Sequence, residues 1–194
     1  MKHIVRVVAH WALLIHIYVS MAGFTLAVLF GTTGLAMNHQ DFGLSEPRLA
    51  KSEITLDRTL LDKPDQAALE RHLRQQLGIQ SPATDYHEEP DEIQMTFAIP
   101  GARTVVTINR ADGIGQVERE NRGFFGKVGD LHKGFDTGKV WPWIIDLAAL
   151  FIVVSSLTGI GTLLALRARR RTGFTVGLLG VLTVLAIYIA WVPK

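Results

Sequence analysis

Three long apolar stretches restrict this chain more than any other feature of its sequence. They cover Val7–Met37, Trp141–Leu166 and Gly173–Val192, and each is nearly free of charged residues. A helix needs about 20 consecutive apolar residues to cross the hydrocarbon core of a bilayer. The sequence therefore predicts an α-helical membrane protein with three transmembrane helices in contact with the lipid bilayer.

The first stretch is not typical of a cleavable signal peptide. Lys2, His3 and Arg6 give it a basic start, but the apolar run is far longer than the roughly 7–15 residues of a signal-peptide core. It also lacks a convincing small-residue cleavage site before the polar segment. We interpret it as a retained helix.

The basic residues predict an orientation. Lys2 and Arg6 precede the first stretch, and the short link between the second and third is Arg167–Arg171. Three alternating crossings place both groups on one side, which is the cytoplasm by the positive-inside rule. We expect an N-terminal transmembrane helix at 1–39, a periplasmic domain with its connectors at 40–139, and a helical hairpin at 140–194, in the bacterial inner membrane. The C-terminus would then be periplasmic.

The central region reads as a small α+β domain. It has 13 Lys and Arg against 17 Asp and Glu. After a polar connector at 41–55, the segment Asp62–Gly78 predicts a helix, with Pro64 near its first turn, a C-terminal glycine and leucines at four-residue spacing. A loop at 81–91 then leads into three strands.

Those strands form an antiparallel meander in our prediction. Residues 92–99 alternate apolar and polar side chains, 103–110 are rich in β-branched residues, and 116–121 form a shorter strand. Arg122–Lys139 is Gly-rich and returns the chain to the membrane, where Trp141 and Trp143 mark the interface.

Composition excludes several functional classes. The chain has no cysteine, so disulfides, iron–sulfur clusters, thiolate zinc sites and a cysteine nucleophile are all excluded. A net charge of +2 is too small to indicate nucleic-acid binding. No hydrolase, zinc-protease, phosphate-loop or dinucleotide-binding motif is present.

Histidines inside the first apolar stretch are candidate functional residues, because membrane spans normally avoid ionisable groups. His16 lies about 15 Å along the helix from Val7. It could form a hydrogen bond to another helix, or it could ligate a metal. His10 lies six residues earlier and about 120° around the helix, so the two cannot both be axial ligands of one haem.

His39 and His132 form a second candidate pair. His39 ends the first stretch and His132 lies just before the second, so both return to the same membrane face. Two imidazoles from separate segments suit a bis-histidine b-type haem, and Met37 offers an alternative axial sulfur. The two histidines could equally be interfacial residues that never meet. Copper handling by Met37 and His39 is a weaker hypothesis, because the ligands are too few.

The remaining chemistry-bearing residues have simpler interpretations. We expect His3 among lipid headgroups, and His72 and His87 on a solvated surface. Asp146 is the only acidic residue in the second and third spans; it could reach the interface or hold a histidine in one tautomer.

A Thr-Gly pair occurs in both of the first two spans, in GTTGLAMNH and in SLTGIGTLL. Small residues allow helices to approach closely, so helix packing is the simplest explanation of this echo.

The chain resembles the PepSY-associated transmembrane proteins. The resemblance rests on LLIHIYVSMAGF, on TTGLAMNH, on the ADGIGQV turn of the central domain and, most specifically, on LHKGFDTGKVWPWIIDLAALFIVVSSLTG. It covers nearly the whole chain and implies a PepSY-like periplasmic domain.

Larger proteins in this family are inner-membrane reductases implicated in releasing iron from siderophores, with b-type haems held by membrane histidines. The resemblance therefore implies that His16, His39 and His132, with His10 as a further candidate, are haem ligands. This chain has fewer spans than those reductases, and its inner face offers only His10 and His16. A second haem would need a homodimer or another subunit.

Two functions follow. The first is electron transfer through haem b to the periplasm, as a ferric-chelate reductase or one of its subunits. The alternative is a non-catalytic accessory or regulatory subunit of a larger membrane complex. In that case the PepSY domain binds a periplasmic partner, and Gly173, Gly177 and Gly180 belong to the docking face.

Overall fold

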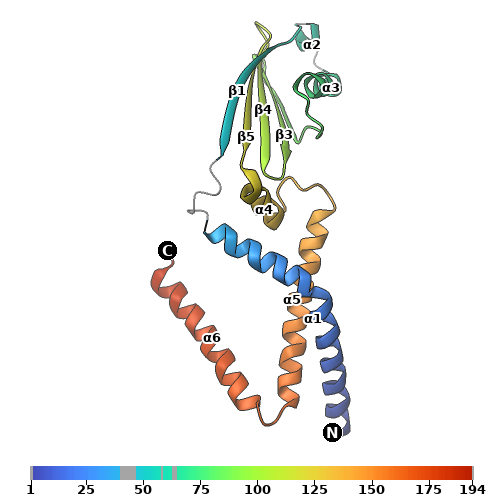
Figure 1. Ribbon diagram of the computed structural model, residues 1–194, viewed down its shortest axis with the longest axis vertical. Helices are drawn as coiled ribbons and strands as arrows, with labels where there is room; N and C mark the ends of the chain where they lie inside the picture. Colours follow the sequence, from blue (N-terminus) through green and yellow to red (C-terminus); the bar gives the residue numbers. More distant parts are fainter. Residues whose placement is uncertain (1, 40–46, 58, 63–64, 194) are drawn as a thin grey trace. The chain divides into compact units, whose positions relative to one another are not determined.

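The computed structural model describes residues 2–39, 47–57, 59–62 and 65–193 (Figure 1). It contains three helices that are long and apolar enough to cross a membrane: α1 (Lys2–Asn38), α5 (Trp141–Ala165) and α6 (Arg170–Trp191). The three predicted spans are therefore confirmed, and the chain is a multi-pass membrane protein. The side chains of Lys2, His3 and Arg6 lie outside the described part, as do residues 40–46 and Pro64.

The chain forms two compact units, one of residues 1–28 with 146–194 and the other of residues 29–145. Helices α1 and α5 each contribute residues to both. Among the described residues, the first unit consists mainly of helices and the link between α5 and α6, and the second contains the sheet.

Small residues let α1 pack on α5 in the helical unit. Gly23 is buried, and a Cβ atom there would lie only 2.6 Å from Cβ of Phe151. A Cβ atom at Gly161 would lie 3.3 Å from Cβ of Ala12. Close approach through such residues is the usual packing mode of membrane helices, which gain no hydrophobic free energy from leaving lipid. None of the residues of α6, all of which are described, is buried.

The second unit is built on a five-stranded antiparallel sheet. Its strands are β1 (Arg48–Thr55), β2 (Asp85–Glu88), β3 (Glu92–Ile99), β4 (Ala102–Asn109) and β5 (Ile114–Asn121), in the order β1-β5-β4-β3-β2. The predicted meander is confirmed as β3, β4 and β5.

Two strands lie where the sequence predicted a connector and a loop. β1 pairs with β5 over its full length, from Arg48 opposite Asn121 to Thr55 opposite Ile114, and β2 pairs with β3. Both are edge strands with mainly exposed side chains. They lack the apolar alternation that predicts a strand, because the backbone pairing of an edge strand needs no buried face.

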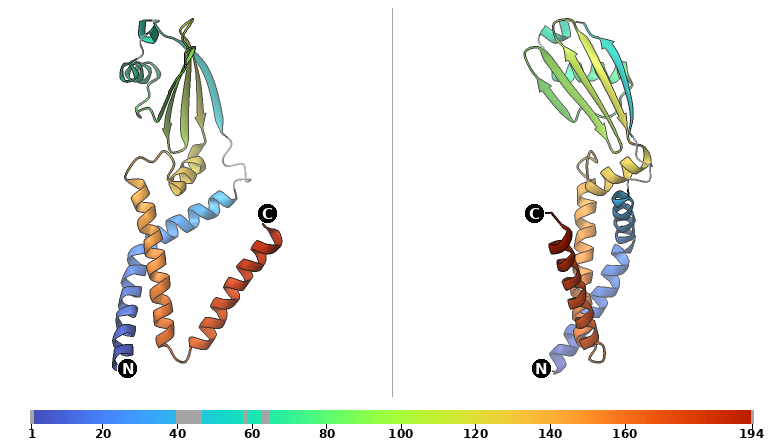
Figure 2. Two further views of the ribbon diagram at one scale, coloured as in Figure 1. Left: turned by 180° about the vertical axis from the view of Figure 1, so that it is seen from behind. Right: turned by 90° about the vertical axis from the view of Figure 1, so that its left-hand side faces the viewer.

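Helix α3 (Gln66–Leu77) covers one face of the sheet (Figure 2). Asp65 caps it by accepting the Ala67 N–H, and Gly78 ends it at φ 68°, as predicted for a C-terminal glycine. The helix thus begins after the predicted Asp62, which lies in the short helix α2 (Thr59–Asp62). The core joins buried side chains of α2, α3 and the inner sheet face: Leu56, Leu61, Leu69, Leu73, Ile93, Met95, Phe97, Val106, Ile108 and Val117.

The segment that returns the chain to the membrane also differs from expectation. Part of it forms helix α4 (Gly123–Lys133), which ends at Gly134 with φ 79°. Gly126 and Gly129 in its interior give this helix a low intrinsic propensity. Its existence therefore depends on tertiary contacts, which local sequence patterns do not reveal.

Candidate cofactor site

His16 of α1 is held by the backbone of α5. Its Nδ1 lies 3.0 Å from the carbonyl oxygen of Ser155 and 3.3 Å from Oγ1 of Thr158. A carbonyl can only accept, so the hydrogen-bond pattern assigns the proton of the neutral ring to Nδ1. The Thr158 hydroxyl already donates to the Val154 carbonyl, which leaves its oxygen as an acceptor. The lone pair of the imidazole is then on Nε2.

A glycine makes room for this ring. A Cβ atom at Gly159 would lie 3.3 Å from Cε1 of His16, tighter than most side-chain contacts. The Thr-Gly pair at 158–159 thus supplies both a hydroxyl and a flat surface to the histidine. One of the two interpretations of His16, a hydrogen bond to another helix, is confirmed. Because that bond uses Nδ1, it leaves ligation through Nε2 open.

His132 repeats this arrangement in the sheet-containing unit. It lies in the last turn of α4, and its Nδ1 is 2.7 Å from Oγ1 of Thr33 in α1. Oγ1 of Thr33 also lies 3.2 Å from the Phe30 carbonyl. A hydroxyl has one proton, so both contacts are hydrogen bonds only if Thr33 donates to Phe30 and Nδ1–H of His132 donates to Thr33. The lone pair is again on Nε2.

The surroundings of His132 also match. A Cβ atom at Gly34 would lie 3.3 Å from Cε1 of the ring, and the Phe30 ring centroid lies 5.4 Å from that of His132. The Thr-Gly echo in the sequence is therefore more than generic helix packing. Each copy receives a histidine from another helix and fixes its Nδ1.

The other predicted ligands lie in more open positions. His39 is exposed in the turn after α1, where its N–H donates to the Ala36 carbonyl at 3.3 Å. Met37 packs towards α4, with Cγ 3.9 Å from a Cβ position at Gly129. His10 is exposed and meets the ring of Trp11 edge-on.

The residues expected at the surface are there. His72 is exposed on α3, and His87 is exposed on β2 with Nε2 3.2 Å from a carboxylate oxygen of Asp85. Asp146 lies in the first turns of α5 and is exposed. The Ser155 carbonyl fixes the tautomer of His16, and the Thr33 hydroxyl fixes that of His132. Asp146 therefore does not hold either of these histidines in one tautomer.

Sequence reasoning missed the group that holds α4 in place. Asp130, two residues before His132, is buried, with 3% of its surface exposed. Its carboxylate accepts the Gly101 N–H at 2.8 Å and Arg122 Nη2 at 2.6 Å. Nothing distinguishes this aspartate from its neighbours in the sequence, because its partners are at the far end of a hairpin and at the start of the helix.

The donor set fits haem better than a bare metal ion. Among the described residues there is no group of three or more His, Cys, Asp or Glu side chains that could hold a metal. A porphyrin supplies most of the ligands of its own iron, so haem needs only one or two imidazoles. Metal-ligating histidines typically donate their other N–H to a carbonyl or similar acceptor, as His16 and His132 do.

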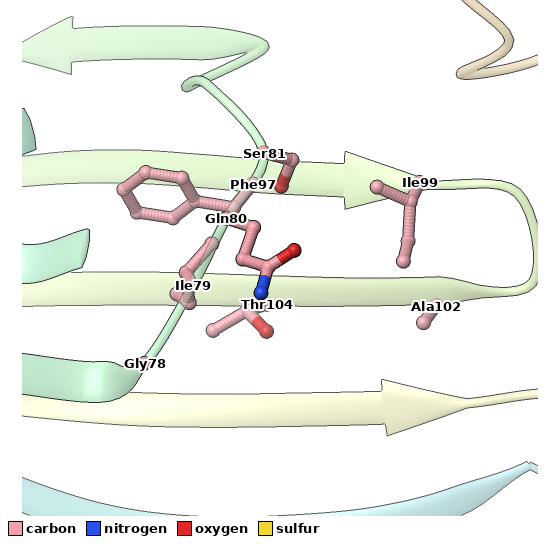
Figure 3. Close-up of a pocket in the computed structure, with 8 residues that line it drawn as sticks. All are labelled: Gly78, Ile79, Gln80, Ser81, Phe97, Ile99, Ala102 and Thr104. Atoms are coloured by element: carbon pink, nitrogen blue, oxygen red, sulfur yellow. The ribbon is translucent and has the colours of Figure 1, made fainter. Parts of the chain in front are cut away.

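The sheet domain has a pocket of its own, with a cavity volume of about 580 Å³ (Figure 3). It lies between the segment that follows α3 and strands β3 and β4. The lining is apolar with a few neutral polar groups, and contains Gly78, Ile79, Gln80, Ser81, Phe97, Ile99, Ala102 and Thr104. No lining side chain is charged, so this pocket suits a neutral, partly apolar group.

Comparison with known proteins gives one family. A family model described as PepSY_TM-like matches residues 9–193. No curated protein and no solved structure matches the chain.

Proposed function

The chain belongs to the PepSY_TM-like family, and we propose that it is a haem-binding electron-transfer protein of the bacterial inner membrane. One observation carries this proposal. Two imidazoles, His16 and His132, each have Nδ1 fixed by a neighbouring helix, which presents Nε2 as the ligating nitrogen. The same feature appearing twice, on two Thr-Gly pairs, favours ligation over incidental packing.

The residues have separate roles in this proposal. His132 would hold haem b at the outer face together with His39, or with Met37 as the alternative. His16, with His10, would serve an inner site. Ser155 and Thr33 would fix the tautomer of the two imidazoles, and the apolar helices would exclude water. Bound haem supplies a one-electron ferric/ferrous couple.

The inner site needs a second polypeptide. His10 and His16 point to faces of α1 about 120° apart, so the second imidazole for His16 comes from a second copy of this chain or from another subunit. We propose a homodimer or a larger complex for this reason.

The orientation that we propose favours outward electron flow. Arg167, Arg169, Arg170 and Arg171 lie in the link between α5 and α6 or at the start of α6, and the positive-inside rule assigns them to the cytoplasm. The sheet domain is then periplasmic. A ferric chelate such as an iron-loaded siderophore is the acceptor that this arrangement favours.

An optical spectrum tests the function directly. Protein purified after haem-replete expression should show a Soret band, with sharpened α and β bands after reduction by dithionite. His132→Ala and His16→Ala should each lower the haem content, whereas His72→Ala, at an exposed site on α3, should not. Haem-free wild-type protein overturns the proposal.

A second candidate is a non-catalytic accessory or regulatory subunit. It is favoured by α6, none of whose residues is buried, since an apolar helix with exposed side chains along its length can pack against a larger complex. The neutral pocket of the sheet domain would then receive part of a periplasmic partner. A stable, haem-free complex with a larger membrane protein would decide for this function.

A further inference from the structure

The sequence of helix α4 has a low intrinsic helix propensity. Two glycines in its interior, Gly126 and Gly129, each cost about 1 kcal/mol of helix propensity relative to alanine, and Gly123 at its start has φ 63°. A helix of this composition is held by its contacts. Because His132 lies in the last turn of α4, those contacts also set its position relative to Thr33.

One of these contacts is an ion pair between a buried carboxylate and a partly exposed guanidinium. Asp130 is 3% exposed, and a carboxylate at such a site is tolerated only when it is paired and hydrogen-bonded. It accepts Arg122 Nη2 at 2.6 Å from the residue that precedes the helix. Arg122 Nε is buried with no hydrogen-bond partner among the described residues, and Glu120 Oε1 is 3.7 Å from it. The negative charge of Asp130 therefore offsets most of the free-energy cost of burying part of the Arg122 guanidinium.

The same carboxylate fastens α4 to the turn between β3 and β4. Asp130 accepts the Gly101 N–H at 2.8 Å, and the Gly101 carbonyl accepts the backbone N–H of Arg122 at 2.8 Å. A Cβ atom at Gly101 would lie 2.8 Å from the backbone nitrogen of Lys127, and φ there is 82°. Both ends of α4 are therefore bonded to one residue of the turn, and its middle is packed on it.

Helix geometry links this contact to the histidine. Asp130 and His132 are two residues apart, which is about 3 Å along the helix axis and about 200° around it. One side chain therefore faces the sheet while the other faces Thr33 and Gly34 of α1. Between them the Leu131 carbonyl accepts Trp141 Nε1 at 2.7 Å. The last turn of α4 is fixed on three sides.

We propose that Asp130, paired with Arg122, is the positioning residue for His132. It sets the place and the tautomer of the imidazole by locking α4 to the Gly101 turn. The role of His132 as a haem ligand rests on the proposed function, but the positioning itself does not require haem.

Nitrogen-15 NMR of the His132 ring in detergent-solubilised, full-length protein tests the proposal without haem. Wild-type protein should give the single Nδ1–H tautomer at neutral pH. Asp130→Asn and Arg122→Lys should replace this signal with a mixture of tautomers. Asp136→Asn, an exposed position in the same segment, should leave it unchanged. Asp130→Glu should restore part of the wild-type signal.

Haem-loaded protein gives a second readout. Asp130→Asn should shift the electron paramagnetic resonance signal and the midpoint potential of the haem, while the amide spectrum of the sheet stays that of the wild type. If Asp130→Ala does not fold, Asp130→Asn and Arg122→Lys still decide the test. An unchanged His132 ring signal in both of them overturns the positioning role. Haem-free wild-type protein overturns the proposed function alone, because the ring signal is measured without haem.

Discussion

Nδ1 of His132 lies 2.7 Å from the hydroxyl oxygen of Thr33, although the two residues are 99 positions apart in the chain. The bond joins the short helix after the sheet to the first membrane helix. It fixes one imidazole nitrogen and leaves the other with its lone pair. The sequence only suggested that His132 lies near the membrane, whereas the structure gives it a defined hydrogen-bond partner.

Thr33→Val removes this hydrogen bond and keeps the shape of the side chain. Loss of the outer partner of a ligating histidine typically weakens metal affinity roughly 10- to 100-fold. We expect haem retention to fall on that scale, measured by titration with haemin and competition by apomyoglobin. Thr33→Ser keeps the hydroxyl and is the matched control. Equal haem affinity in the Val and Ser variants contradicts the role of this bond.

Gly34→Val should displace the His132 ring. A Cβ atom at this position already lies 3.3 Å from Cε1 of His132, and the two γ-methyl groups of valine leave no space for the ring. Gly31→Val, on the same helix, has no atom within 4 Å of its Cβ position and is the control. The haem content per protein, measured by pyridine haemochrome, should drop only in the first variant. Similar values for both would show that the fit at Gly34 is unimportant.

Gly159→Val tests the second imidazole in the same way. Its Cβ would lie 3.3 Å from Cε1 of His16, whereas Gly177 on α6 has open space around it. We expect Gly159→Val to change the haem spectrum that depends on His16, and Gly177→Val to leave it as in the wild type. A loss of haem in the α6 variant instead would point to a role for that helix.

Leu73→Ala should destabilise the sheet domain by about 2–5 kcal/mol, because Leu73 is fully buried between α3 and the sheet. Leu49→Ala, at an exposed position of β1, should change the free energy of unfolding by less than about 1 kcal/mol. Hydrogen exchange of the β4 amides in the full-length protein measures both. Comparable effects of the two substitutions would contradict the assignment of Leu73 to the core of the sheet domain.

The orientation can be tested with single cysteines, because the chain has none of its own. Ser52→Cys in β1 and Ala168→Cys in the arginine link are both exposed. In intact cells with a permeable outer membrane, a membrane-impermeant maleimide should label the cysteine at position 52 but reach position 168 only after the inner membrane is opened. The reverse pattern would reject the proposed topology.

Local patterns predicted the parts of the fold that depend on local physics. The three spans follow from run length and apolarity, and α3 follows from its leucine spacing and from the glycine that ends it. The meander follows from strands with one buried face, where side chains alternate. β1, β2 and α4 have no such pattern. Their stability comes from backbone pairing at sheet edges or from contacts with residues far along the chain.

The candidate site divides in the same way. By itself, the sequence determined that this is a three-span membrane protein with a small α+β domain, and it identified histidines as the candidate ligands, because hydrophobicity and residue type are properties of each segment alone. Only the tertiary structure decided that His16 meets Ser155 and Thr158, that His132 meets Thr33, and that Asp130 is buried. A hydrogen bond acts over about 3 Å, and which groups come that close is set by how distant segments pack.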